Sequence, residues 1–251
     1  MSETQEWNIP LTGKKTVAIV GFAPSSFLSA PYQNEAIEIW GINELPIVQG
    51  VSRVTRLFQL HTKQEYSKGR NAGKIIDWMK SATIPIYMQE KEKEFPSSVR
   101  FPIKEVLEIS KTNYFTNSIS YIIAFAILQG AKKIELWGVD MARIEEYEAQ
   151  RPSVEYFIGW ARGLGVEVTV PSQSDILHTT HLYGYQEEEL LPIQNKLLRR
   201  NKELIDRHEQ AMAKTKRSAE EEAYILGARH ENEQVQKAYF PLKYRPNRTL
   251  E

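Results

Sequence analysis

The stretch Thr16–Ser26, with the sequence TVAIVGFAPSS, decides the fold expected of this chain. Its first five residues form a continuous uncharged run, which suits a strand buried on both faces of a sheet. In open α/β sheets, the loop after the first strand holds phosphates on backbone amides at a helix amino terminus. A glycine-proline turn with a serine cap is the alternative. The candidate ligand contacts of this loop are Gly21, Pro24, Ser25 and Ser26.

Apolar runs of strand length alternate with helix-like stretches as far as residue 170. This alternation predicts an α/β fold: a Rossmann-like, mostly parallel sheet with helices on both faces. The expected strands are Thr16–Val20, Glu38–Gly41, Arg56–Leu60, Ile84–Met88, Ile134–Trp137 and Val166–Val170. The expected crossover helices are Gly73–Ser81, Ser118–Gln129 and Ser153–Gly163.

The charge of the chain is balanced, because lysine plus arginine equals aspartate plus glutamate at 32 each among 251 residues. The net charge therefore gives no steering towards nucleic acid or an anionic membrane. Cysteine is absent, which excludes disulfides and cysteine nucleophiles and fits a reducing compartment. No apolar run approaches the roughly 18 residues that span a bilayer, and no secretory signal is recognisable. We expect a cytoplasmic protein without a membrane or nucleic-acid partner.

A long charged segment begins near residues 183–188. Its apolar residues step by three, four or seven positions, which predicts a helix with a narrow apolar seam. A second helix from Ser218 to Tyr239 completes an expected α-helical hairpin. Because a solvated seam is costly, the hairpin is expected to pack on its own domain or on another subunit of a homo-oligomer. The seam consists of Leu190, Ile193, Leu197, Leu204 and Ala211.

These patterns divide the chain into four parts. Residues 1–15 form an N-terminal extension, and residues 16–184 form the Rossmann-like nucleotide-binding domain. Residues 185–240 form the helical hairpin, and residues 241–251 form an extended tail.

Polar residues follow three of the expected strands. In a parallel sheet, residues just beyond the strand ends face the ligand crevice. Asn43 is therefore placed to bind a base or ribose, with Glu44 beside it. His61 is a candidate general base or ligand contact, and Asp140 is a candidate to accept from a sugar hydroxyl, to hold a cation or to take a proton. The alternative for Asn43 is that it is an ordinary turn residue. The alternative for His61 is that it is a histidine whose ring is satisfied by hydrogen bonds.

A second polar cluster opens the apolar helix expected at 118–129. Thr116, Asn117 and Ser118 offer a hydroxyl, an amide and a helix dipole to an anion such as a diphosphate. Helix capping alone also explains them. Gly138 ends the strand that follows this helix.

The next helix is expected to open at Pro152, because proline suits the first helical position. This leaves Gln150 and Arg151 in a loop that borders the crevice. Arg151 can clamp a phosphate, and Glu155 can accept a proton from an attacking hydroxyl. The alternative is a local ion pair between Arg151 and Glu155. His178 and His181 lack a third ligand nearby, so no metal is expected.

Three separated segments resemble, in order and spacing, the bacterial sialyltransferase family of the Campylobacter lipooligosaccharide enzymes. They are Thr16–Ser26, Ile39–Glu44 (IWGINE) and Thr116–Asp140, and they are also similar to the archaeal pterin pyrophosphokinase-like proteins. In the sialyltransferases, the matching loops hold a cytidine nucleotide donor. The resemblance implies this role for Gly21, Pro24, Ser25, Asn43, Thr116, Asn117, Ser118 and Gly138.

The chain departs from that family at the general base. The sialyltransferases use a histidine after the Gly-x-Asp strand, whereas residues 145–165 contain none here. Residues 146–156 instead resemble uncharacterised Rossmann-like proteins of bacteriophages, which places the protein in a host cytoplasm if it is phage-encoded. The remaining candidates for a catalytic base are Glu155, His61 and Asp140.

Together, these features predict a nucleotide-dependent transferase that moves a sugar from a nucleotide-sugar donor to a hydroxyl acceptor. The expected ligand is a nucleotide or nucleotide sugar. Two alternatives stay open: a noncatalytic protein that binds or sequesters nucleotides, and an oligomeric structural or morphogenesis protein.

Overall fold

A computed structural model describes residues 6–13, 15–142, 149–179, 182–185, 197, 199–206, 226–228, 230–231 and 234. The chain divides into two compact units, Met1–His178 and Thr179–Glu251. Each unit is described by itself below. Within the described residues, no helix has both the length and the apolar character that crossing a bilayer requires.

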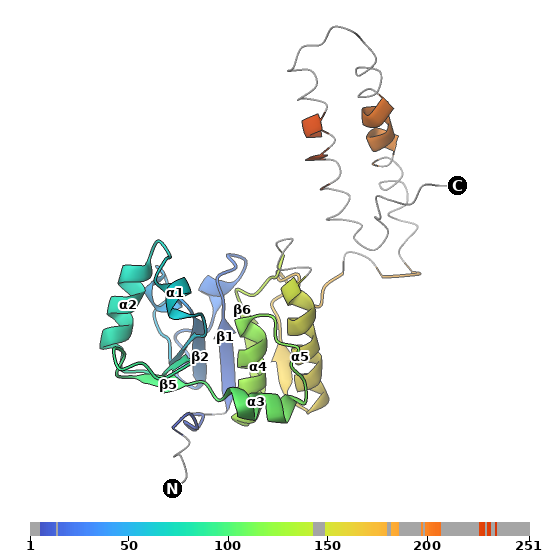
Figure 1. The fold of residues 1–251 in the computed structure, drawn as a ribbon. Helices are drawn as coiled ribbons and strands as arrows, with labels where there is room; N and C mark the ends of the chain where they lie inside the picture. Colours follow the sequence, from blue (N-terminus) through green and yellow to red (C-terminus); the bar gives the residue numbers. More distant parts are fainter. Residues whose placement is uncertain are drawn as a thin grey trace. The chain divides into compact units, whose positions relative to one another are not determined.

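The first unit is built on one sheet, in which all the described strands run parallel (Figure 1). Its order is β5-β4-β3-β2-β1-β6-β7. The chain therefore adds strands outward from β1 on one side and then returns to place β6 on the other side of β1. The strands are β1 (Thr16–Val20), β2 (Ile37–Ile42), β3 (Arg56–Gln59), β4 (Ile86–Met88), β5 (Ser98–Arg100), β6 (Lys133–Trp137) and β7 (Glu167–Thr169).

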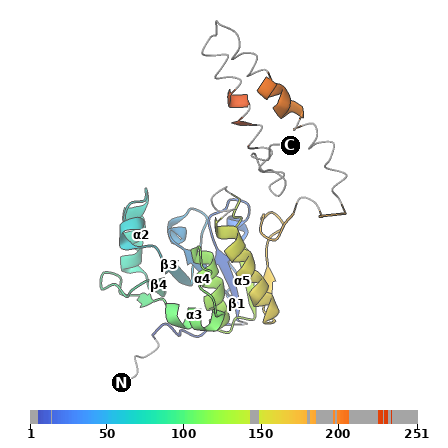
Figure 2. The same cartoon turned by 45° about the vertical axis from the view of Figure 1, so that its right-hand side comes forward.

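Helices and turns cover both faces of this sheet. Val17 and Ile19 on β1 belong to the core cluster that includes the α4 and α5 side chains. Ala18 and Val20 face the opposite side, where Leu45 packs against them. Figures 1 and 2 show α4 and α5 side by side over one face. The helices are α1 (Lys63–Tyr66), α2 (Ala72–Ser81), α3 (Ile103–Ser110), α4 (Ser118–Leu128) and α5 (Arg151–Gly163), and the 3-10 turns are η1 (Phe27–Ser29) and η2 (Leu45–Ile47).

An aromatic cluster joins α4 to the centre of the sheet. The ring of Phe125 on α4 lies 5.5 Å from Trp40, 5.8 Å from Phe58 and 4.9 Å from Tyr87. All four side chains are fully buried. Because large aromatic rings supply much of the apolar area that a core removes from water, this cluster fixes α4 against β2, β3 and β4.

A buried ion pair closes the amino-terminal edge of the sheet. Arg56 Nε lies 2.7 Å from Glu38 Oε2, and both side chains are 3% exposed. Thr12 N donates to Glu38 Oε1 at 2.7 Å, and Arg56 Nη2 donates to the Pro10 carbonyl at 3.0 Å. These bonds satisfy the buried charges and hold residues 10–12 across the strand starts, so this segment belongs to the folded unit.

The expected α/β fold is confirmed: the sheet is parallel, helices lie on both faces, and the six expected strands and three crossover helices are present with small shifts at their ends. The sequence patterns missed β5, α1 and α3. β5 has only three residues, and one of them, Arg100, is exposed, so no apolar run marks it.

The element that directly follows β1 is the 3-10 turn η1 and not an α-helix. Ala30 precedes Pro31 and adopts φ −58° and ψ 149°, the extended conformation that proline imposes on its predecessor. Ser26 stands at the N-cap of this turn without a side-chain cap hydrogen bond. The loop after β1 therefore does not offer a helix dipole to a phosphate.

In the second unit, residues 199–206 are helical, as are the described residues among 226–234. Leu204 of the predicted seam is buried. Leu190, Ile193 and Ala211, the connection between the helices and the tail 241–251 lie outside the described residues. The homo-oligomer stays a prediction.

Candidate functional site

The loops after β1 and β6 touch each other at the carboxyl edge of the sheet, where the strand order reverses. Gly21 N donates to the Trp137 carbonyl, and Ala23 N donates to the Gly138 carbonyl, each at 2.8 Å. A Cβ on Gly21 would lie 2.5 Å from the Gly138 oxygen. On Gly138, which has φ +63°, a Cβ would lie 2.6 Å from Phe27 Cβ. Both glycines are required by this close approach.

Two serines connect the same loops through their side chains. Ser26 Oγ accepts a hydrogen bond from Gly138 N at 2.8 Å, and Ser26 is 3% exposed. Ser25 Oγ donates to Asp140 Oδ1 at 2.7 Å. The structure thus brings together five of the predicted site residues, Gly21, Ser25, Ser26, Gly138 and Asp140, with Pro24 exposed beside them. Ser26 is a structural link, whereas Ser25 and Asp140 form a partly exposed polar pair at the edge.

A cavity of about 340 Å³ opens at the carboxyl ends of β2 and β3. Asn43 follows β2 with φ +48°, and its backbone N–H donates to the Phe58 carbonyl at 3.0 Å. This bond fixes a left-handed turn, which asparagine tolerates better than most residues. The cavity is lined by Phe22, Asn43, Glu44, Gln59, His61, Glu65, Tyr66 and Ile75.

Three polar atoms of the cavity residues are buried without a hydrogen-bond partner. They are Asn43 Oδ1, Gln59 Oε1 and the Tyr66 hydroxyl. Gln59 is 1% exposed and Tyr66 is 8% exposed. Leaving such an atom unpaired costs about 1 to 3 kcal/mol, and most buried polar groups in proteins are paired. Three such atoms belong to residues that line one cavity, so water or a small polar ligand is the remaining candidate partner for them.

Burial also affects the ionisation of the cavity tyrosine. The pKa of Tyr66 is raised above its ordinary value, mainly because burial disfavours the phenolate. Tyr66 therefore presents a neutral hydroxyl at physiological pH, which can both donate and accept a hydrogen bond.

The rim of this cavity carries the predicted residues Glu44 and His61. Glu44 Oε2 accepts from Asn71 Nδ2 at 3.2 Å. His61 Nδ1 lies 3.9 Å from Glu65 Oε2, and its side chain is 47% exposed. The hydroxyl and the backbone N–H of Thr62 donate to the same Glu65 oxygen, and these hydrogen bonds lower the pKa of Glu65. Glu65 is held in place beside His61 as an anion.

The polar cluster at the start of α4 caps this helix, which was the alternative to a ligand role. Asn117 Oδ1 accepts from Ser120 N at 2.9 Å. Its Nδ2 donates to the Gln150 carbonyl at 3.1 Å, which brings these two predicted residues together. Thr116 is exposed, and Ser118 is the first residue of α4. The amino terminus of this helix therefore faces the same edge of the sheet as the loops after β1 and β6.

Arg151 and Glu155 form the local ion pair that stood as the alternative to a ligand role. Arg151 Nε lies 2.8 Å from Glu155 Oε1. The same oxygen accepts from Leu177 N at 2.9 Å, and Arg151 Nη2 donates to the His178 carbonyl at 3.0 Å. The expectation that Arg151 lies in the loop is wrong, because Gln150 is the N-cap and α5 begins at Arg151, with Pro152 in its first turn.

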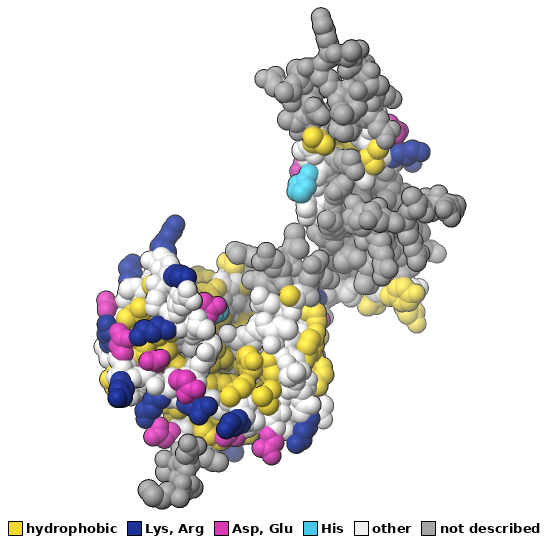
Figure 3. Space-filling model, viewed as in Figure 1, with side chains coloured by type: hydrophobic (Ala, Val, Ile, Leu, Met, Phe, Trp, Pro, Cys, Tyr) yellow, Lys and Arg dark blue, Asp and Glu magenta, His cyan; other side chains and the backbone are white. Residues whose placement is uncertain are grey.

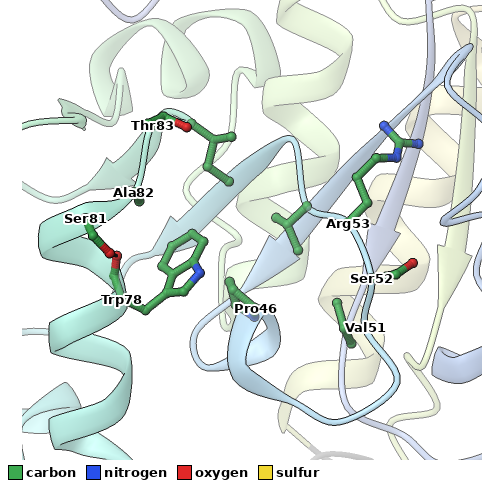
Figure 4. Close-up of a pocket in the computed structure, with 10 residues that line it drawn as sticks. Pro46, Val51, Ser52, Arg53, Trp78, Ser81, Ala82 and Thr83 are labelled. Atoms are coloured by element: carbon green, nitrogen blue, oxygen red, sulfur yellow. Dashed lines mark hydrogen bonds between the residues drawn. The ribbon is translucent and has the colours of Figure 1, made fainter.

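A second cavity, of about 280 Å³, lies before the starts of β3 and β4, at the opposite edge (Figure 4). Trp78 on α2 and Pro46 line it, together with residues 51–54. Arg53 at its side donates to the carbonyls of Tyr32, Asn34 and Ile37, so its guanidinium is already bonded. Within the described residues, no group of three or more His, Asp or Glu side chains is arranged to hold a metal ion.

Sequence reasoning missed Gln59 and Tyr66. A signal for both exists in the chain. Gln59 is a polar residue at the end of a buried strand, and Thr62 with Glu65 forms a capping box that starts α1 and places Tyr66 on it. What the sequence did not show is that these residues face the loop after β2.

No protein-family model and no curated protein matches the sequence. Among solved structures, the chain is similar to the sialyltransferase CstII from Campylobacter jejuni in complex with cytidine-5′-monophosphate. The identity is 14% over 62% of this chain and 78% of that chain, with a TM-score of 0.43.

The monofunctional α-2,3-sialyltransferase Cst-I from Campylobacter jejuni is 13% identical over 75% of this chain and 98% of that chain, with a TM-score of 0.46. Thiamine pyrophosphokinase from Bacillus subtilis is 10% identical over 62% of this chain and 60% of that chain, with a TM-score of 0.38. These neighbours include the sialyltransferases whose loops the sequence resembles, and the likeness is one of fold.

Proposed function

We propose that the protein binds a nucleotide along the carboxyl edge of its sheet and transfers a sugar from it to a hydroxyl acceptor. The observation that carries the binding part is the cavity with three buried, unpaired polar atoms on Asn43, Gln59 and Tyr66. Its volume falls within the usual range for small-molecule sites, and it lies where open α/β sheets bind ligands.

The chemistry of these atoms fits a nucleobase better than a phosphate. Two carboxamides and a neutral phenol offer donors and acceptors without a net positive charge. Phe22 and Ile75 add apolar walls, against which a flat ring can pack. A planar heteroaromatic ring with nitrogen and oxygen atoms at its edge satisfies both features.

The nucleotide would then extend from the cavity across the loop after β1. Phe22 lines the cavity and directly follows Gly21. The phosphates would lie between this loop and Thr116–Ser118, where the amino terminus of α4 supplies backbone N–H groups and a positive dipole end. The resemblance of the same loops to the nucleotide-binding loops of sialyltransferases supports this direction.

We choose Asp140 as the carboxylate that accepts the proton of the acceptor hydroxyl. Asp140 Oδ1 accepts a hydrogen bond from the neutral Ser25 hydroxyl, whereas Glu155 forms an ion pair with Arg151 and also accepts from Leu177 N. In the transfer, the acceptor oxygen bonds to the anomeric carbon, and its proton passes to Asp140. The bond from that carbon to the donor phosphate breaks, and the nucleotide leaves with the electron pair.

Calorimetric titration of the full chain with cytidine and uridine nucleotides and their sugar conjugates tests the binding. We expect saturable binding, with Asn43→Ala weaker than the wild type by about 1 to 3 kcal/mol. The matched control is Gln33→Ala, an exposed carboxamide bonded to Ser52. The absence of binding at millimolar nucleotide contradicts the proposal.

A noncatalytic nucleotide-binding protein is the second candidate, and the engagement of Glu155 favours it, because the ion pair removes one predicted base from reaction. Nuclear magnetic resonance of the bound nucleotide sugar with a mixture of glycoside acceptors separates the two. Formation of a new glycosidic bond supports transfer, and tight binding with the donor recovered intact supports the noncatalytic role.

A further inference from the structure

The cavity at the carboxyl ends of β2 and β3 carries carboxylates without a basic side chain to balance them. Glu44 and Glu65 line it, and no lysine or arginine is among the described lining residues. On the face seen in Figure 3, the described basic and acidic side chains are interspersed over α1 and α2 rather than gathered by sign. Selection of a ligand therefore depends on the individual groups of the cavity, and these favour hydrogen-bond donors over anions.

One of the two carboxylates, that of Glu65, is already engaged within its own helix. Its Oε2 accepts hydrogen bonds from the backbone N–H and the hydroxyl of Thr62, both at 2.8 Å, and lies 3.9 Å from His61 Nδ1. The bonds to Thr62 form the capping box of α1. Glu44 is therefore the carboxylate that remains for a ligand.

The side chain of Glu44 is held in place with one oxygen free. Glu44 is the N-cap of η2, whose first residue, Leu45, is fully buried. Its Oε2 accepts from Asn71 Nδ2 at 3.2 Å, and no described residue donates to its Oε1. Gly69 leaves room beside this oxygen, because a Cβ on Gly69 would lie 2.9 Å from Oε1. The carboxylate is thus oriented by the protein, and Oε1 is available to accept from a ligand.

Neutral polar atoms of the cavity residues add further acceptors. The carboxamide oxygens of Asn43 and Gln59 and the hydroxyl of Tyr66 are buried without a hydrogen-bond partner. The carboxamide oxygens can only accept, whereas the hydroxyl can donate or accept. Together with Glu44, these atoms call for a ligand that presents several N–H donors and also an acceptor.

Guanine fits this demand better than the other common bases. Its N1–H and its N2 amino group lie side by side and can donate to one carboxylate in a bidentate arrangement, while O6 and N7 accept. Cytosine and adenine place a ring acceptor nitrogen beside the amino group, and uracil places carbonyl oxygens on both sides of its N–H. A carboxylate repels such acceptors, because it has no hydrogen to donate. Phe22, which is 40% exposed, and Ile75 offer apolar walls to the flat ring.

We propose that the cavity selects the guanine base of a nucleotide and that the Glu44 carboxylate determines this selection by accepting from N1–H and from the N2 amino group. The proposal rests on the proposed function in one respect, the binding of a nucleobase in this cavity. It does not depend on the transfer of a sugar.

Calorimetric titration of the full chain with the 5′-monophosphates of guanosine, inosine, xanthosine and cytidine tests the proposal. Inosine monophosphate differs from guanosine monophosphate only in lacking the N2 amino group, and xanthosine monophosphate has an oxygen in its place. We expect guanosine monophosphate to bind about tenfold more tightly than each of the others, the scale of one bidentate contact to a base. Equal affinities for guanosine and inosine monophosphates would overturn the selection.

The variant Glu44→Gln should reverse the preference. Because Asn71 Nδ2 donates to Oε2, the new carboxamide keeps its oxygen there and turns its NH₂ group to the place of Oε1. This group donates to the xanthine oxygen and repels the guanine amino group, so xanthosine monophosphate should bind more tightly than guanosine monophosphate. The control Glu108→Gln, at an exposed position on α3, should keep the wild-type order. An unchanged order in Glu44→Gln would overturn the role of Glu44.

Further titrations separate this proposal from the proposed function. Cytidine and uridine monophosphates that bind as tightly as guanosine monophosphate, and less tightly to Tyr66→Phe, would leave the nucleotide site in place and overturn the guanine selection. Absence of binding of every nucleotide would contradict both proposals. Binding of putrescine that Glu44→Gln abolishes, without a preference for guanosine monophosphate, would assign the cavity to a cationic amine and overturn the selection.

Discussion

Ser25 and Asp140 are separated by 115 residues in the sequence and are joined by a hydrogen bond of 2.7 Å. The bond connects the loop after β1 to the loop after β6, the two strands between which the strand order reverses. In open α/β sheets this point holds the ligand, so the bond places a hydroxyl and a carboxylate together where a reacting group would lie.

The first prediction concerns the role of Asp140 as a base. Asp140→Asn keeps the shape of the side chain and an acceptor for Ser25, but it cannot take a proton. We expect nucleotide affinity near that of the wild type and a transfer rate lower by about 10²- to 10⁴-fold, measured by product formation. A variant that transfers at the wild-type rate would remove Asp140 from the chemistry.

The second prediction concerns the contact between the two loops. Gly138→Ala places a Cβ 2.6 Å from Phe27 Cβ, at a residue with φ +63°, and should destabilise the fold and weaken nucleotide binding together. The matched control is Gly159→Ala on α5, where a Cβ meets nothing within 4 Å. The control should stabilise the protein by about 0.5 to 1 kcal/mol, as alanine does within helices. Urea unfolding of both variants measures the two changes in unfolding free energy, which should have opposite signs. Equal changes in the two variants would contradict the account.

The third prediction concerns the buried ion pair at the other edge of the sheet. Arg56→Met leaves the buried Glu38 carboxylate without its counter-charge, although Thr12 and Trp40 still donate hydrogen bonds to it, and should cost about 3 to 5 kcal/mol of unfolding free energy. The exposed pair of Lys91 with Glu6 serves as the control, because Lys91→Ala should cost less than about 1 kcal/mol. Denaturant midpoints of the two variants decide the matter, and similar losses would show that the buried pair has no special role.

The fourth prediction concerns alkaline pH. Burial raises the pKa of Tyr32 from 10.0 to about 12, and its hydroxyl donates to the Phe27 carbonyl at 2.9 Å. Because the folded-state pKa is raised, this stabilisation is fully present below pH 10 and is lost as the pH rises towards 12. Phenolate absorbance should show one tyrosine ionising near pH 12 that disappears in Tyr32→Phe. An identical titration curve for the variant would refute the assignment.

Much of the fold follows from local sequence, because β1 is a continuous uncharged run and β2 and β3 are buried almost throughout. β6 alternates buried and partly exposed residues. Asn43 and Asp140 could be proposed as site residues because Asn43 directly follows β2 and Asp140 lies three residues after the end of β6. β5 escaped notice because Ser98–Arg100 contains a single apolar residue, whereas β7, the other three-residue edge strand, lies within the predicted run Val166–Val170. The absence of a helix after β1 depends on Pro31 acting on Ala30, a local rule that the strand pattern concealed.

The cavity itself could not be predicted, since its residues come from separate parts of the chain. Nothing in the sequence around Gln59 and Tyr66 connects them with Asn43. The parallel pairing of β2 with β3 brings them to the same cavity. The ion pair of Arg151 with Glu155 was foreseen as an alternative from its i, i+4 spacing, but its link to Leu177 requires the folded chain.

The most direct test of the nucleotide site is Tyr66→Phe, which removes one unpaired buried hydroxyl and nothing else. Without ligand, the variant should be as stable as the wild type or more stable, because the wild-type hydroxyl lacks a partner. Calorimetric titration with cytidine and uridine nucleotides should show affinity reduced by about 1 to 3 kcal/mol, since the ligand loses that hydrogen bond. Unchanged nucleotide affinity, together with lower stability of the free variant, would contradict the claim that the cavity of Asn43, Gln59 and Tyr66 binds the base.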